Sequence, residues 1–251
     1  MTLDFMDLVP VIMVFVLYFA GLPIVYSLFG GAFFYFLFID TTTQPFMVMM
    51  KVMNSTASYS LLAIPFFVMS GSIMNYGGIA DKLMDFAECI TGHMRGGLAQ
   101  VNVVLSMMMG GCSGSANADC AMQSKMLVPE MEKRGYSKAF SAAITAASSA
   151  ATPVIPPGVN LIVYAVIAQC SLARVFAAGY LPGLLMSLSM MIVVAIIAKK
   201  RNYPRSRDKF PPWKEVGKQA ITSFWGLFFP FGIILGMRFG LFTASEGGAF
   251  A

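Results

Sequence analysis

The sequence is poor in charge and in the residues of catalytic and metal chemistry. Only 12% of its 251 residues are charged, and it contains one histidine, His93, and four cysteines. The cysteines show no CxxC spacing, so we interpret them as packing thiols and predict no transition-metal site. A phosphate-binding loop of the type GxxxxGK(S/T) is also absent from these residues. We expect no enzymatic activity and no cofactor other than a coupling ion.

Apolar residues are abundant. They make up 57% of the chain, and the mean hydropathy of +0.72 is far from that of a soluble domain. Several apolar stretches reach or approach the roughly 20 residues that cross a bilayer as a helix. They cover residues 8–39, 60–75, 140–169 with a break, 175–198 and 221–239. Because lipid cannot satisfy the hydrogen bonds of a lone sheet's edges, the sequence predicts an all-α integral membrane protein.

The first apolar stretch lacks a basic n-region and is too long for a signal peptide, so we expect it to remain in the mature protein. We predict one long helix over residues 8–39, interrupted at Gly21 and Pro23. A short surface helix over 46–53 and an outward crossing over 61–74 are expected to follow.

The net charge of +5 is unevenly distributed. Eight of the 17 Lys and Arg residues lie between Lys199 and Lys218, where only Asp208 and Glu215 oppose them. The positive-inside rule predicts a cytoplasmic loop here, and this distribution argues against nucleic-acid binding. The first residues contain two acids and no base, which predicts an N-terminus outside the cell membrane.

Residues 79–94 are amphipathic. Apolar residues such as Leu83 and Phe86 share one helical face, and charged residues such as Asp81 and Asp85 share another. Such a helix either lies in the membrane interface or crosses the membrane packed against protein. We favour a short crossing, because the interfacial alternative would break the alternation of basic loops.

Residues 98–131 predict a re-entrant hairpin. Its apolar arms, 98–109 and 118–128, are each too short to span, and a Gly- and Ser-rich stretch over 110–117 separates them. Basic residues flank both ends, so both ends lie on the same side. Such a polar tip at membrane depth is tolerated only where protein or a water-filled cavity surrounds it.

Residues 139–169 predict a discontinuous helix. Three prolines in five residues, Pro153 to Pro157, must unwind it between residues 152 and 158. A discontinuous helix beside a re-entrant hairpin is typical of the binding site of secondary transporters.

These segments predict five crossings and a hairpin before Lys199, so a following repeat would start inside, in inverted topology. We expect the matching hairpin beyond Ala251, and no transport by a stand-alone chain of this length. The predicted parts are a scaffold helix with a surface helix (1–60), connecting scaffold helices (61–95), half of a transport domain (96–170), a helix with a basic cytoplasmic loop (171–218) and the start of a second repeat (219–251).

The two polar breaks offer ligands for a sodium ion. Unwound backbone carbonyls and hydroxyls provide oxygens without the cost of burying an anion. The glycines at 110, 111 and 114 permit close backbone approach, and the arm beginning near Asn117 presents N–H groups suited to a carboxylate. The side-chain oxygens belong to Ser113, Ser115 and Asn117 at the tip and to Ser148, Ser149 and Thr152 at the break.

Two structural alternatives stay open. Ser141, Ser148 and Ser149 are equally compatible with close helix packing, which small residues favour in membranes. Asp119 lies in an apolar stretch, where an acid is expensive and generally has a function. Its alternative is an internal salt bridge with Lys125.

Four stretches of the chain, between residue 61 and about 204, carry these motifs: LLAIPFFVMSGSIMNYGGIADKL, GHMRGGLAQVNVVLSMMMGGCSGSANAD, VPEMEKRGYSKAFSAAITAASSAATPVIPPG and AGYLPGLLM. Together they resemble the large membrane subunit of tripartite ATP-independent periplasmic (TRAP) transporters. Where many members have Gly-Pro in the second hairpin arm, this sequence has Ser124-Lys125. The surrounding stretch is weakly similar to sialic-acid members.

The resemblance implies an elevator-type transporter of inverted repeats in a bacterial inner membrane. It implies import of carboxylates such as C4-dicarboxylates or sialic acid, driven by a sodium gradient. The implied partners are a small four-helix membrane subunit and a periplasmic substrate-binding protein. The implied cation site comprises Ser113, Gly114, Ser115, Asn117, Ser148, Ser149, Thr152 and Pro153. The implied substrate site comprises Ser115, Asn117, Asp119, Pro156 and Gly158.

Two other functional classes are alternatives. In a channel or structural membrane scaffold, the hairpin would form a static filter. In an intramembrane hydrolase, Ser113 would be the nucleophile, but His93 is expected at a membrane edge, which disfavours a Ser–His pair.

Overall fold

The computed structural model describes residues 5–39, 44, 46–57, 59–207 and 209–250. Within these ranges the chain forms helices and no strand, which confirms the all-α prediction. Its backbone divides into two compact units, Met1–Ser58 and Tyr59–Ala251.

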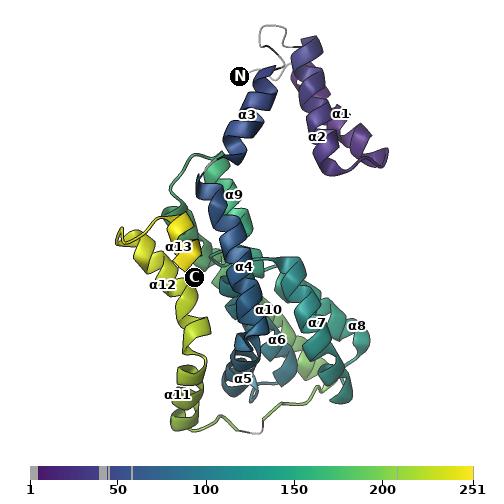
Figure 1. Ribbon diagram of the computed structural model, residues 1–251. Coiled ribbons are helices and arrows are strands. Elements are labelled where there is room, and N and C mark those ends of the chain that lie inside the picture. The colour runs from purple at the N-terminus through teal and green to yellow at the C-terminus, as the bar shows by residue number, and fades with distance from the viewer. Residues whose placement is uncertain (1–4, 40–43, 45, 58, 208, 251) are drawn as a thin grey trace. The chain divides into compact units, whose positions relative to one another are not determined.

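The first unit contains a helical hairpin and a separate helix (Figure 1). Helices α1 (Phe5–Phe19) and α2 (Ile24–Phe34, continued by a π-helical turn η1 over Tyr35–Ile39) pack side by side. The prediction of one long interrupted helix over 8–39 is wrong, because Gly21 adopts a φ of +92° and the chain reverses there. Gly31 lies so close to α1 that a Cβ would come within 2.9 Å of the Pro10 carbonyl oxygen. Helix α3 (Phe46–Thr56) occupies the predicted 46–53 segment.

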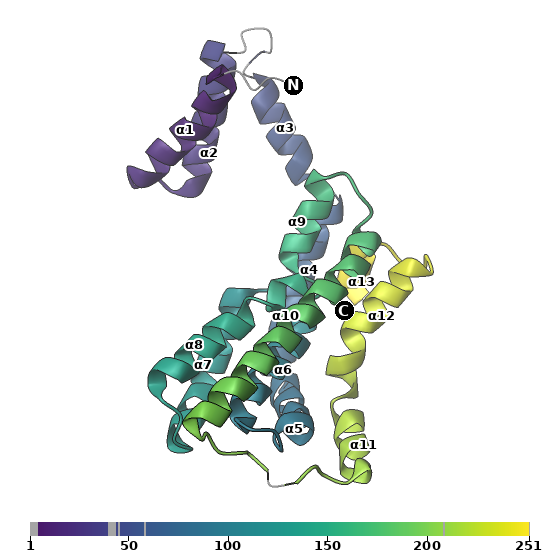
Figure 2. The same ribbon diagram turned by 180° about the vertical axis from the view of Figure 1, so that it is seen from behind.

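The second unit contains the remaining helices (Figures 1 and 2). In chain order they are η2 (Tyr59–Leu62), α4 (Ala63–Tyr76), α5 (Ile79–Thr91), α6 (Gly97–Ser113), α7 (Ala116–Lys133), α8 (Lys138–Ser149), η3 (Thr152–Val154), α9 (Val159–Ile167), α10 (Leu172–Arg201), α11 (Trp213–Thr222), α12 (Phe224–Arg238) and α13 (Ala244–Phe250).

Helix α6 is the centre of this unit. It contacts α4, α5, α7, α8, α10, α12 and η3, and apolar residues along it, such as Val101 and Leu105, are fully buried. A helix that is apolar on most sides is expected to be enclosed by others. The second hairpin arm, α7, and the first part of the broken helix, α8 with η3, therefore pack around the buried first arm.

Helix α5 shows the predicted amphipathic pattern. Leu83 and Phe86 are buried, whereas Asp81 and Asp85 are exposed. Its apolar face packs on α6, and its other neighbours include α11. That this helix crosses the membrane stays a prediction.

Among the described residues, α10 alone is a single helix long and apolar enough to span a bilayer. Two bent pairs would raise the number to three if each counted as one span: residues 138–154 with α9, bent by 41°, and α11 with α12, bent by 66°. The other apolar helices are 10–17 residues long. Helix α10 agrees with the crossing predicted over 175–198, and the predicted total of five crossings stays a prediction.

The basic loop after α10 is hydrogen-bonded to two connections between helices, the α5–α6 connection and the α7–α8 connection. The backbone N–H groups of Ser206 and Arg207 both donate to the carbonyl of Gly92, at 2.9 Å. From the α7–α8 turn, the Tyr136 hydroxyl donates to the carbonyl of Pro204 at 3.0 Å, and Arg134 donates to the Ser206 hydroxyl at 2.7 Å. Burial raises the pKa of Tyr136 to about 12, so its hydroxyl remains a donor at physiological pH.

A substitution at the contact between α6 and α12 tests how closely helices pack around α6. We expect Gly111→Ala to lower the apparent melting temperature of the purified protein by several degrees, because a Cβ there would collide with the Pro230 ring. Overpacking of this kind costs about 1–3 kcal/mol. Gly217→Ala on α11 is the control, since its Cβ would meet nothing within 4 Å and it gains the same helix propensity. Equal melting temperatures for the two variants would contradict the packing.

Candidate functional site

The turn between α6 and α7 contains two residues with different roles. Gly114 adopts a φ of +57°, a left-handed conformation that ends α6 and that side chains other than hydrogen rarely allow. Ser115 is extended and caps α7, where its hydroxyl accepts from the backbone N–H of Ala118 at 3.5 Å. The two helices therefore reverse direction within a two-residue turn.

This turn packs directly on the break of the discontinuous helix. A Cβ on Gly114 would lie 2.7 Å from the Pro157 carbonyl oxygen and 3.2 Å from Gly158 Cα. A Cβ on Gly110 would lie 3.0 Å from the Thr152 carbonyl oxygen. The two polar breaks, which are far apart in sequence, are thus in backbone contact. Gly110 and Gly114 permit this close approach because they have no side chain.

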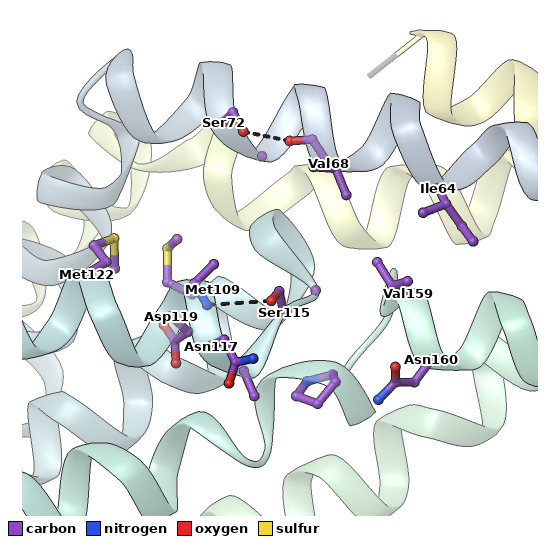
Figure 3. Close-up of a pocket in the computed structure, with 15 residues that line it drawn as sticks. Ile64, Val68, Ser72, Met109, Ser115, Asn117, Asp119, Met122, Val159 and Asn160 are labelled. Carbon is purple, nitrogen blue, oxygen red and sulfur yellow. Dashed lines mark hydrogen bonds between the residues drawn. The ribbon is translucent and has the colours of Figure 1, made fainter. Parts of the chain in front are cut away.

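A cavity of about 450 Å³ opens beside this contact. Figure 3 shows Ile64, Val68 and Ser72 of α4 on one side of it and Ser115 and Asp119 on the other. Ser72 donates to the carbonyl of Val68 in its own helix at 2.8 Å. The lining residues are Ile64, Val68, Gly71, Ser72, Met109, Gly114, Ser115, Ala116, Asn117, Ala118, Asp119, Met122, Pro153, Val159 and Asn160.

Two helices begin at the cavity wall. Helix α7 starts at Ala116 and α9 starts at Val159, and both residues line the cavity. The first N–H groups of a helix lack intrahelical partners and carry partial positive charge, so they attract anions. None of the lining residues in the described structure is basic. The helix N-termini are therefore the source of partial positive charge among the residues that line this cavity.

Asp119 connects the cavity to a buried polar cluster. Its side chain is 1% exposed and accepts two hydrogen bonds, from Thr152 Oγ1 and Gln123 Nε2, each at 2.8 Å. Gln123 Nε2 also donates to the hydroxyl of Ser106 at 2.7 Å. Lys125 is exposed, and no ion pair joins it to Asp119 within the described ranges, so the salt-bridge alternative is not formed.

A second cluster lies between α6 and α8. Ser148 donates to Asn102 Oδ1 at 2.6 Å, Asn102 Nδ2 donates to Thr145 Oγ1 at 2.8 Å, and all three residues are fully buried. Ser149 donates to the carbonyl of Thr145 at 2.8 Å. Ser148 and Ser149 are therefore not among the residues that line the cavity.

All of the predicted site residues except Ser113 fall into three groups. Gly114, Ser115, Asn117, Asp119 and Pro153 line the cavity, and Thr152, Ser148 and Ser149 lie in the buried polar clusters behind it. Pro156 and Gly158 are buried in the break. Ser113 ends α6, and its side chain lies outside the described part of the structure.

Sequence reasoning missed the partners of these residues. They are Asn102, Ser106, Gln123 and Thr145 in the clusters, and Asn160 in the cavity. The sequence contains a pattern that indicates these partners, because polar residues recur four apart within the expected helices and so share a helix face. The pairs are Asn102 with Ser106, Asp119 with Gln123, and Ser141 with Thr145.

The hydrolase alternative meets a geometric obstacle. His93 lies just before α6 and packs edge-on against Phe210 at 5.1 Å, whereas Ser113 is the last residue of α6. A helix of that length spans roughly 25 Å. The backbones of these two residues therefore lie too far apart for a Ser–His pair.

A helical chain with an apolar helix long enough to span a bilayer, a discontinuous helix and a polar cavity at converging helix ends has the organisation of secondary membrane transporters. The chain belongs to the DctM component family of the tripartite ATP-independent periplasmic transporters, whose family model matches residues 11–251. This confirms the resemblance drawn from the sequence motifs.

Curated relatives agree with this assignment. The chain is 34% identical to the sialic acid TRAP transporter permease protein SiaT of Haemophilus influenzae, over 92% of this chain and 37% of that protein. It is 37% identical to the 2,3-diketo-L-gulonate TRAP transporter large permease protein YiaN of Escherichia coli (92% and 54%). It is 36% identical to the C4-dicarboxylate TRAP transporter large permease protein DctM of Pseudomonas aeruginosa (80% and 47%). The chain spans about half of the length of these relatives, or less.

The Asp119 cluster gives a stability prediction. Thr152→Val keeps the shape of the side chain but removes the hydroxyl that donates to Asp119, which leaves a buried acceptor short of one partner. We expect a loss of about 1–3 kcal/mol, seen as a lower midpoint of denaturation in detergent. Thr222→Val is the matched control, because that hydroxyl is exposed and bonds only its own helix, to the carbonyl of Lys218. An unchanged midpoint for Thr152→Val would show that the bond contributes nothing to folding.

Proposed function

We propose that this chain forms part of the large permease subunit of a secondary transporter that imports small organic anions with sodium ions. The observation that carries the proposal is the cavity between the hairpin turn, the helix break and α4. Two helix N-termini and the buried Asp119 meet there without a basic side chain among the lining residues.

The proposed coupling follows from charge. The Asp119 carboxyl group accepts hydrogen bonds from two neutral donors, and no cationic side chain pairs with it in the described ranges. A sodium ion beside it would supply the missing positive charge and could take oxygens from Ser115 and Asn117 as ligands. The same ion would reduce the repulsion between Asp119 and a substrate carboxylate bound at the helix N-termini. Cation and anion would then each raise the affinity for the other.

The proposed architecture is an elevator of two inverted repeats. In it, the α6–α7 hairpin is re-entrant and the cavity described above is the part of the site contributed by the first repeat. The matched part covers only 37–54% of these relatives, which supports a second repeat that completes the site. An N-terminus on the periplasmic side of a bacterial inner membrane belongs to this proposal.

Substrate and partners are proposed from the relatives. Sialic acid, 2,3-diketo-L-gulonate and C4-dicarboxylates, named in the three relatives, all carry at least one carboxylate. That shared group matches the two helix N-termini at the cavity. We therefore propose a carboxylate substrate, delivered by a periplasmic binding protein to a complex that includes a small four-helix membrane subunit.

Uptake by the assembled transporter tests the proposal. In proteoliposomes with an inward sodium gradient and the binding protein, we expect Asp119→Asn to reduce uptake more than about tenfold, since it removes the charge opposite a buried cation. The same variant should raise the sodium concentration for half-maximal uptake. Asp81→Asn is the matched control, because Asp81 is exposed on α5.

Ser115→Ala provides a second site variant, with Ser189→Ala on α10 as its control, since Ser189 bonds only its own helix, to the carbonyl of Met186. We expect Ser115→Ala to impair uptake and Ser189→Ala to leave it unchanged. Normal sodium-driven uptake by both Asp119→Asn and Ser115→Ala would overturn the proposal. Non-saturable uptake that ignores the binding protein would favour a channel.

A further inference from the structure

Helix α11 has one covered face and one uncovered face. Its covered face turns polar residues toward α5, and Glu215 and Gln219 line a polar cavity of about 190 Å³ together with Asp85 and Glu88. On the opposite side Trp213 is 79% and Ile221 77% exposed, and no residue of α11 is buried. The side chain that would be added at Gly217, between these two, meets nothing within 4 Å.

Two lysines extend the uncovered face. Lys214 and Lys218 are four residues apart, so they point to the same side of the helix, next to the stripe of Trp213, Gly217 and Ile221. Both are exposed, and neither forms an ion pair within the described ranges. The acid of this helix, Glu215, is occupied by Arg207 at 2.7 Å. The uncovered face therefore combines apolar side chains with uncompensated positive charge.

The position of α11 relative to its neighbours points to the membrane surface. It is bent by 66° from the apolar α12, which follows after one residue. It lies at the same end of the second unit as the last turn of α10, which carries Lys199, Lys200 and Arg201 (Figures 1 and 2). A short amphipathic helix that bends away from an apolar segment at the segment's end is suited to the membrane interface, where tryptophan is favoured.

The ring of Trp213 is held in place by an aromatic chain. Phe210 packs on Trp213 with ring centroids 5.6 Å apart, and Phe210 in turn packs on His93 at 5.1 Å. Trp213 is thus supported on one edge while most of its surface is open. Such a held, exposed indole is suited to the headgroup region, where one end of the ring is apolar and the other polar.

We propose that the exposed face of α11 binds the phosphate headgroups of anionic phospholipids, with Lys214 and Lys218 contacting the anion and Trp213 anchoring in the interface. An acidic soluble protein would match the lysines but would need an apolar patch of its own to cover Trp213 and Ile221. A lipid surface matches both, because it offers negative charge above apolar chains. The site is separate from the substrate cavity and does not depend on the transport proposal.

Fluorescence quenching in nanodiscs tests the proposal on the assembled transporter. The difference in emission between the parent and Trp213→Phe reports Trp213 alone, whatever other tryptophans the complex contains. We expect bromine-labelled phosphatidylglycerol to quench this signal more strongly than equally labelled phosphatidylcholine at the same mole fraction. The preference for phosphatidylglycerol should fall about fivefold for each lysine removed in Lys214→Gln/Lys218→Gln and should weaken at high salt.

A matched pair of charge removals controls this experiment. Lys133→Gln/Lys138→Gln removes the same charge from the α7–α8 turn, where each lysine is already paired with a glutamate at 3.7 Å, and should leave the preference unchanged. Lys214→Arg/Lys218→Arg should retain it, which separates a charge effect from misfolding. Equal quenching by the two lipids in the parent would overturn the proposal. Absence of quenching by either lipid would also overturn it, because protein then covers this face.

Discussion

The contact between the hairpin turn and the helix break is the constraint on which the rest of the second unit depends. Gly114 approaches the Pro157 carbonyl so closely that a side chain cannot be accommodated, and its positive φ reverses the chain at the same point. Because the turn rests on the break, α7 and α9 both begin at one cavity. Two weak helix-end potentials therefore act on the same volume, which neither segment could achieve alone.

Hydrogen bonding maintains this arrangement from behind the cavity. Thr152, at the break, donates to Asp119 on α7, and Asn102 on α6 joins Thr145 and Ser148 of α8. Buried polar groups are costly unless they are paired, so each cluster favours one register of hairpin against broken helix. Some polar residues at the site thus hold it together and others face the cavity, and Asp119 does both.

Sequence patterns predicted much of this with simple physical reasons. Proline clustering required a break in residues 139–169, and a Gly- and Ser-rich stretch between short apolar arms required a turn near residue 114; both are present. The prediction of one helix over the first apolar stretch is wrong because Gly21 and Pro23 are compatible with either a kink or a reversal of the chain. Only the packing of Gly31 against α1 decides between them. Similarly, the sequence predicts Ser148 and Ser149 as cation ligands, whereas their hydroxyls bond residues of the buried cluster. The hydrogen-bond partner of a hydroxyl depends on which residues lie near it in the fold, and the sequence does not show this.

The sequence by itself determined that the chain is helical and apolar, where its two polar breaks fall, and which family it resembles. Those properties depend only on residue type and on spacing along the chain. The bilayer's thickness sets the length of a spanning helix, and the backbone geometry of proline and glycine sets where a helix ends. The tertiary structure decided that the two breaks touch, that Asp119 bonds Thr152 and Gln123 rather than Lys125, and that α11 leaves Trp213 uncovered. These features arise from contacts between residues distant in sequence, and a local pattern carries no information about which of several polar neighbours will be nearest.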